Sequence, residues 1–199
     1  MPPGSPPLCA RCVIVEAIAQ EWLTPPERLA IAYAPRPLRR AWTGLIALDH
    51  RLADAARPGR DAIMIQLRLA WWRDRLAEPA DKWPRGEPLL GLLGAWDAER
   101  AALAALVDGF EAQVVGEDGG AAITSARAEA IVALTRLAGL PETPAIRRAA
   151  ARWAEGLAPG TGLPRALRPL VLMHHFDSAG DAPAWRIMLG ALRKGFVGL

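Results

Sequence analysis

The chain has few cysteines and no long uncharged apolar run. Cys9 and Cys12 are its only cysteines in 199 residues, so a disulfide framework is excluded, and no second ligand pair follows to complete a zinc site. The longest uncharged apolar stretches, such as 41–48 and 88–96, fall well short of the ~18 residues that a membrane-spanning helix requires. These absences leave a protein whose fold depends on its hydrophobic core.

Positive charge is spread thinly along the chain rather than gathered in a tract. The formal net charge is +3, and lysine occurs only at Lys82 and Lys194, so nearly all cations are arginine. No stretch concentrates these charges as a nucleic-acid-binding surface would. Hydrophobic residues make up 52% and charged residues 23% of the chain, which predicts a folded globular protein without a nucleic-acid partner.

The first residues predict an extension ahead of the folded domain. Residues 1–8 are rich in proline and glycine and lack the basic and apolar regions of a secretory signal. We therefore expect a partly flexible N-terminal extension over 1–23, one folded domain over 24–199, and a cytoplasmic location. Peripheral association with a membrane is the alternative location.

Apolar residues recur at three- and four-residue spacing, and no segment shows the period of two that a strand requires. Thr24-Pro25-Pro26-Glu27 combines a capping hydroxyl, an early proline and a glutamate three residues after the cap, which predicts a helix that ends at Pro35 and Pro37. The predicted fold class is all-α, a single multi-helix domain; a helical solenoid is the alternative, but no repeat of fixed period is present. Breakers separate further predicted helices at about 37–57, 60–76, 89–96, 97–115, 122–138, 143–157, 164–176 and 182–196.

Three of these helices have a face that should pack in the core. In 60–76 we expect Arg68, Asp74 and Arg75 to point toward solvent or a pocket. The residues predicted to point inward are Leu38, Trp42, Leu45, Ile46, Leu52 and Ala56, then Ile63, Leu67 and Trp71 with Trp72 as a further candidate, and Leu103, Leu106, Val107 and Phe110.

Three segments occur in the order seen in squalene/phytoene synthase-like proteins, and the chain resembles that family from about Leu29 to its end. The Trp-Trp-Arg segment is the most distinctive, and weaker similarity continues through 106–111 and 165–170. The resemblance implies a truncated form of the isoprenoid synthase fold. The segments are Leu29-Ala30-Ile31-Ala32-Tyr33-Ala34-Pro35, Leu45-Ile46-Ala47-Leu48-Asp49-His50-Arg51-Leu52-Ala53-Asp54 and Leu69-Ala70-Trp71-Trp72-Arg73-Asp74-Arg75-Leu76.

The resemblance implies where catalytic groups would lie. The family's enzymes join two prenyl diphosphates head to head in a helical cavity, with two aspartate-rich helices facing each other across it. Carboxylates three or four residues apart share one helix face, so they can hold Mg²⁺ ions that neutralise a departing diphosphate.

The positions that match these acidic motifs hold few carboxylates. The first motif falls at 53–57, where Asp54 stands alone and Arg57 is placed to pair with it. Asp49 cannot substitute, because five residues of helix turn it roughly 140° away from Asp54. The second motif would follow 97–115, where residues 121–130 contain only Glu129. We therefore expect no metal site and no cofactor.

These observations favour a non-catalytic family member that acts as a binding or assembly factor and keeps a narrowed isoprenoid or lipid cavity. It would be similar to mitochondrial relatives that assist assembly of respiratory complex I and also lack intact acidic motifs. The alternative is a divergent prenyl-diphosphate transferase of the squalene/phytoene synthase type, with Mg²⁺ as cofactor and Asp54 as the catalytic residue. A third interpretation is metal-free capture of an isoprenoid or lipid headgroup by Arg68 and Arg73.

Five residues are the candidates for ligand binding: His50, Asp54, Arg68, Trp72 and Arg73. His50 lies four residues before Asp54 and is either a remnant phosphate-binding position or, more simply, its side-chain partner. Guanidinium groups bind phosphate well, so the arginines could line a pocket. The other interpretation is that they lie on solvated helix faces. For Trp71 and Trp72 we favour packing in the core over a role as the wall of a lipid-binding site. The arginines considered are Arg39, Arg40, Arg51, Arg68 and Arg73.

Several other polar groups are expected to be structural. His174 and His175 are adjacent, so they point about 100° apart on a helix and cannot readily share a metal ion. Glu117-Asp118 is predicted to be a solvated turn, and Asp108 and Glu111 an exposed helix surface. The basic amphipathic segment 185–197 either docks on a membrane surface or a protein partner, or packs against the bundle.

Overall fold

Helices joined by short connections make up the fold, which a computed structural model describes over residues 21–116 and 118–178. These described residues contain no strand, which confirms the all-α prediction. None of their helices has both the length and the apolar character needed to cross a membrane. The α-helices are α2 (Pro25–Ala32), α3 (Arg36–Ala55), α4 (Ala62–Ala77), α5 (Pro88–Leu93), α6 (Arg100–Val115), α7 (Ala121–Leu137), α8 (Pro144–Ala154) and α9 (Arg168–Ser178), with 3-10 turns η1 (Ala80–Lys82), η2 (Gly94–Glu99) and η3 (Arg165–Leu167).

The helix starts follow from local capping. Thr24 and Glu27 form the predicted capping box, in which the Thr24 N–H donates to the Glu27 carboxylate at 2.7 Å. Asp61 caps α4 by accepting from the N–H groups of Ile63 and Met64. As predicted, the first helix ends before Pro35 and the next begins near Pro37, which lies in the first turn of α3, where its missing N–H costs no helical hydrogen bond.

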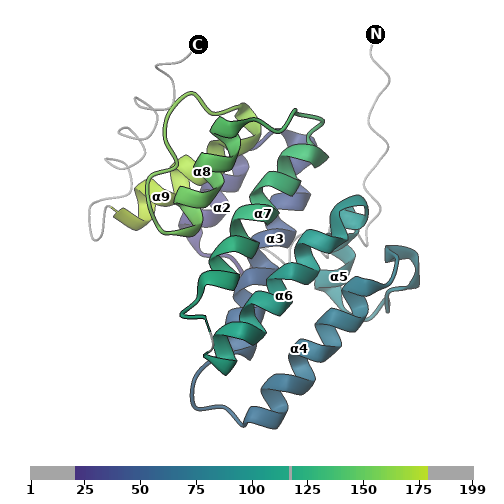
Figure 1. Cartoon of the computed structure of the whole chain (residues 1–199). Coiled ribbons are helices and arrows are strands. Elements are labelled where there is room, and N and C mark those ends of the chain that lie inside the picture. The colour runs from purple at the N-terminus through teal and green to yellow at the C-terminus, as the bar shows by residue number, and fades with distance from the viewer. Residues whose placement is uncertain (1–20, 117, 179–199) are drawn as a thin grey trace.

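The arrangement of the helices places α4 at an edge of the bundle (Figure 1). α6 pairs most extensively with α7, α8 lies beside α7, and α2 packs on α9, while α3 contacts helices from both halves of the chain. The main neighbour of α4 is α6, and its contact with α3 is smaller. α6 and α7 approach closely at Gly109, where an added Cβ would lie 2.7 Å from the Ile123 Cα.

The described helices share one hydrophobic core. Trp42 and Trp96 are fully buried, and their indole N–H groups donate to the carbonyl oxygens of Ala166 and Ala41, both at 2.9 Å. Each ring therefore buries its apolar area without leaving its polar atom unpaired. The inward faces predicted for α3 and α6 are confirmed at Leu38, Trp42, Leu45, Ile46, Leu52, Leu103, Leu106, Val107 and Phe110, whereas Ala56 is only partly buried.

The predicted inner face of α4 is wrong. The sequence places Ile63, Leu67 and Trp71 inside, but their exposed fractions are 70%, 59% and 40%. α4 is apolar on two sides, and packing against α6 and α3 decides which side is buried. The buried stripe lies about half a turn round the helix and consists of Ile65, Leu69, Trp72 and Leu76.

The remaining differences concern helix boundaries. The helix predicted at 89–96 is the short α5 followed by η2, and the one predicted at 164–176 begins as η3 before α9. Glycines at 116, 119 and 120 have positive φ, as the predicted turn requires. Cys9, Cys12, Glu117, the first twenty residues of the predicted extension and the helix expected over 182–196 lie outside the described residues.

Candidate functional site

The carboxylate expected at the first acidic motif is held by two arginines. Asp54 lies near the end of α3 and forms an ion pair with Arg57 at 2.7 Å, which confirms the predicted pair. Arg60, in the connection to α4, donates to both oxygens of the same carboxylate at 2.9 and 3.0 Å. The two guanidinium groups therefore occupy the oxygens that a metal ion would need.

The other carboxylates near the expected motifs are also paired. Glu129 on α7 accepts from Arg136 at 2.9 Å, and Glu99 accepts from the same guanidinium. Asp49 accepts from Arg127 of α7 at 2.8 and 3.0 Å, so α3 presents Asp49 and Asp54 to different neighbours. Asp49 and Glu99 therefore join α7 to other elements, whereas Glu129 and Arg136 pair within α7.

Within residues 21–116 and 118–178, no three His, Cys, Asp or Glu side chains are grouped so that they could hold a metal ion. Asp108 and Glu111 share a face of α6, as predicted, with Asp108 exposed and Glu111 half-buried. Both pair with Arg73 of α4. These two carboxylates therefore join α4 to α6.

The remaining polar candidates have local structural contacts. Asp118 accepts the N–H groups of Ala122 and Gly120 at the start of α7, and these hydrogen bonds hold the pKa of its carboxyl below the ordinary value. The rings of His174 and His175 lie 6.1 Å apart at a tilt of 54°.

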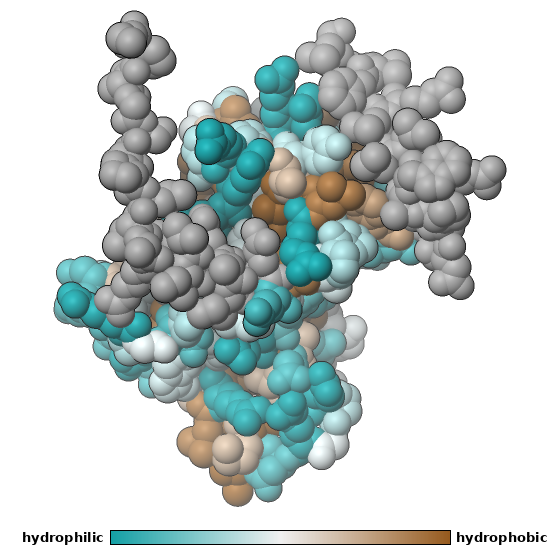
Figure 2. All heavy atoms as spheres, turned by 180° about the vertical axis from the view of Figure 1, so that it is seen from behind, coloured by the Kyte–Doolittle hydropathy of each residue, from teal (hydrophilic) through white to brown (hydrophobic). Residues whose placement is uncertain are grey.

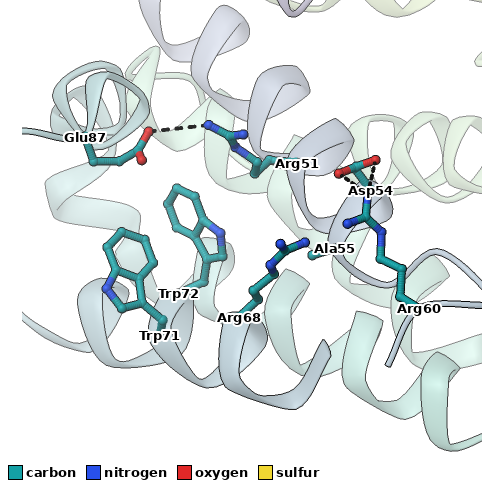
Figure 3. A pocket seen from close by; sticks show the side chains of 8 residues that line it. All are labelled: Arg51, Asp54, Ala55, Arg60, Arg68, Trp71, Trp72 and Glu87. Atoms are coloured by element: carbon teal, nitrogen blue, oxygen red, sulfur yellow. Dashed lines mark hydrogen bonds and ion pairs between the residues drawn. The ribbon is translucent and has the colours of Figure 1, made fainter. Parts of the chain in front are cut away.

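An open pocket of about 440 Å³ lies between α3 and α4 (Figure 3). This volume is in the range of small-molecule sites, roughly 300–1,000 Å³. Charged side chains and two indoles form most of its lining, in contrast to the narrowed apolar cavity that the resemblance implies. The lining residues are Arg51, Asp54, Ala55, Arg60, Arg68, Trp71, Trp72 and Glu87.

The pocket keeps one cation without a counter-ion among the described residues. Asp54 is paired with Arg60, and Glu87 lies 3.7 Å from Arg51. No described side chain pairs with Arg68, which extends from α4 into the pocket (Figure 3). An uncompensated guanidinium in a pocket suits a ligand with an anionic group.

The tandem tryptophans form one wall of this pocket (Figure 3). Their ring centroids lie 4.9 Å apart in an edge-to-face arrangement. Trp72 is 5% exposed and belongs to the core, whereas Trp71 is 40% exposed. The prediction of core packing is therefore confirmed for Trp72 and wrong for Trp71.

His50 lies outside the pocket, and its predicted pair with Asp54 is wrong. Its Nε2 lies 3.0 Å from the Glu27 carboxylate of α2, and its Nδ1 lies 3.0 Å from the Trp22 carbonyl oxygen. The hydrogen bond to Glu27 outweighs burial and raises the pKa of His50 to about 9. His50 is therefore protonated at neutral pH, and both of its nitrogens donate.

Of the predicted ligand-binding residues, Asp54, Arg68 and Trp72 meet at the pocket, whereas His50 and Arg73 lie elsewhere. Arg73 is drawn to α6 because Asp108 and Glu111 lie opposite it. Among the other arginines considered, Arg51 lines the pocket. Arg39 and Arg40 donate instead to the backbone carbonyls of Ala34 and Gly91.

The sequence did not single out Arg60, Trp71 and Glu87 as site residues. A signal existed for Arg60, which lies six residues after Asp54 and returns to it across the α3–α4 turn. The tandem position of Trp71 was a signal as well. No sequence signal indicated Glu87, because it reaches Arg51 only when α5 packs on α3.

No family model, curated protein or solved structure gave a significant match to this chain. The pocket and the α4 surface are therefore the features from which a function can be inferred.

Proposed function

We propose that the protein is a non-catalytic, squalene/phytoene synthase-like binding or assembly factor that holds an anionic amphiphile between α3 and α4 without a metal ion. The observation that carries this proposal is Arg68, which points into the pocket beside Trp71 and Trp72 without a counter-ion among the described residues. A phosphate-bearing head would bind Arg68, and the apolar part would lie against the indoles. An isoprenoid diphosphate is the ligand that the sequence resemblance suggests.

The carboxylate at the pocket is already paired with arginines, which supports metal-independent binding. Mg²⁺ binds through oxygen ligands in a near-octahedral arrangement. Asp54 is already paired with Arg57 and Arg60, so a metal ion would have to displace both guanidinium groups. The same two positive charges repel a divalent cation at this position.

Calorimetric titration of the full chain with farnesyl diphosphate, in chelator and in Mg²⁺, tests the proposal. We expect similar affinity under both conditions. Arg68→Ala should weaken binding by about 10-fold or more, because a hydrogen bond to a charged group contributes about 1.5–3 kcal/mol. Arg73→Ala is the matched control, since Arg73 is on the same helix but pairs with Asp108 and Glu111.

The alternative functions give different results. A prenyl-diphosphate transferase would require Mg²⁺ for binding and would lose binding in Asp54→Ala. Absence of binding under both conditions would contradict a pocket ligand of this class. Weaker binding in Arg73→Ala, with Arg68→Ala unchanged, would contradict the proposed position of the headgroup.

A further inference from the structure

A stripe of exposed apolar side chains follows the outer face of α4. Six large apolar side chains are exposed in the described part of the chain, and four of them belong to this helix. Figure 2 shows hydrophobic side chains gathered at the end of the molecule where α4 begins. The four are Ile63, Met64, Leu67 and Trp71, with exposed fractions of 70%, 48%, 59% and 40%.

The spacing of these side chains places them together on one side of the helix. Residues 63, 67 and 71 are four apart, and Met64 lies beside them on the next row. α6 and α3 pack on the opposite side of α4, so no described helix covers the stripe. The other two exposed residues, Val115 and Leu157, belong to distant parts of the chain. Scattered exposed apolar residues are normal, but a contiguous group of this kind marks an interaction surface.

Positive charge lies beside the stripe. Arg68 is about 100° round the helix from Leu67 and has no counter-ion among the described residues. Arg57 and Arg60 precede α4, but Asp54 and Asp61 in the same stretch balance their charge, so Arg68 is the cation that remains beside the stripe.

The acidic residues of α4 leave its outer face apolar over the first three turns. Asp61 turns its carboxylate back onto the N–H groups of Ile63 and Met64 as the helix cap. Asp74 follows Trp71 by three residues and marks the end of the apolar face. The face therefore consists of an apolar strip with Arg68 along one side.

We propose that this face of α4 docks on a lipid surface that carries anionic headgroups. Interfacial helices bury an apolar face at the boundary of the acyl chains, while cations beside it bind lipid phosphates. Ile63, Met64 and Leu67 supply the apolar face, Trp71 suits the interface, and Arg68 meets the headgroups. The docking face shares Arg68 and Trp71 with the pocket, but Ile63, Met64 and Leu67 lie outside the pocket lining, so the docking goes beyond the function proposed above.

A second copy of the chain is a poorer occupant of the same face. Arg68 lies near the middle of α4 and has no counter-ion among residues 21–116 and 118–178, and a two-fold pairing of antiparallel helices would bring two Arg68 side chains close together. Like charges at this position oppose association. A lipid surface with negative charge would instead attract Arg68 and favour association.

Sedimentation with vesicles tests the proposal on the full chain. Vesicles of phosphatidylcholine mixed with phosphatidylglycerol should bind the protein, and vesicles of phosphatidylcholine alone should bind it less. Ile63→Gln with Leu67→Gln should reduce binding to the anionic vesicles by about 10-fold or more. Leu157→Gln, which lies outside α4 and its neighbour α6, is the control and should leave binding unchanged. Both variants replace exposed side chains, and circular dichroism checks that both fold.

Three results would overturn the proposal. The first is an absence of binding by the unmodified protein. The second is binding that survives the change at Ile63 and Leu67, since another segment would then hold the vesicle. The third is a dimer that dissociates in the same variant, which would assign the face to a second copy. This variant keeps Arg68, so its titration with farnesyl diphosphate reports on the pocket separately.

Discussion

Replacing His50 should change the stability of the protein in a pH-dependent way. The protonated imidazole joins α3 to Glu27 of α2 and to the carbonyl oxygen of Trp22. Because the pKa of His50 is raised from 6.5 to about 9, the folded state holds a proton that the unfolded state releases near pH 6.5. The stabilisation is therefore fully present below pH 6.5 and is lost as the pH rises through about 9.

The size of the effect follows from the pKa and the exposure of the ring. A rise from 6.5 to about 9 corresponds to roughly 3.4 kcal/mol, at 1.36 kcal/mol for each pH unit. The His50 side chain is 39% exposed, so screening by solvent reduces the contribution to about 1–1.5 kcal/mol. Burial raises the pKa of Glu27, but the hydrogen bonds from His50 and Thr24 outweigh it and lower the pKa overall.

Urea unfolding at pH 6, 7.5, 9 and 10 measures this contribution. We expect His50→Gln to be about 1–1.5 kcal/mol less stable than the unmodified protein at pH 6, and the difference to shrink toward a few tenths at pH 10. Glu27→Gln should remove the same pH dependence, because glutamine still serves the capping box of Thr24 but carries no charge. The comparison cancels every contribution that all three proteins share.

Two results would refute this reasoning. A stability difference that stays constant from pH 6 to pH 10 would show that the ion pair with Glu27 is not its source. A difference that grows with pH would show that His50 is neutral in the folded state, so that burial outweighs the carboxylate.

Two substitutions in the core test the packing of the helices by the same unfolding assay. Gly109→Ala should destabilise the protein by about 1–3 kcal/mol, because the added Cβ would lie 2.7 Å from the Ile123 Cα and force α6 away from α7. Gly94→Ala, where nothing lies within 4 Å of the added Cβ, is its control and should be neutral or slightly stabilising. Trp42→Phe should cost about 2–4 kcal/mol, because it removes the buried donor to Ala166 and leaves a void. Losses below about 0.5 kcal/mol would contradict the close α6–α7 approach and the role of the indole hydrogen bond, respectively.

Most helices could be predicted because their signals are local. Local signals act within one turn of chain, so they can be recognised from the sequence alone. Examples are the capping box at Thr24 and Glu27 and the glycines at 116, 119 and 120. Helix ends were less predictable where a 3-10 turn replaced regular helix, as at η2 and η3. Those ends depend on how the neighbouring helices pack.

The candidate site was predictable only where its contacts are local. Asp54 and Arg57 lie three residues apart on one helix face, and their pair was predicted correctly. His50 and Asp54 also share suitable spacing, but Glu27 of α2 competes for the imidazole and binds it. Arg73 was assigned to the site because its partners on α6, Asp108 and Glu111, are distant in sequence and could not be recognised from it. Long-range ion pairs therefore account for most of the errors.

The error on α4 has a physical cause that bears on function. Residues 63, 67 and 71 and residues 65, 69, 72 and 76 both satisfy helical spacing, so periodicity cannot choose the buried face. Packing against α6 and α3 buries the second stripe, and the first remains on the surface, where it contributes little to the stability of the fold. Glutamine at Ile63 and Leu67 should therefore leave the free energy of unfolding within about 0.5 kcal/mol of its original value. Loss of vesicle binding without loss of stability would distinguish a docking surface from a poorly packed core.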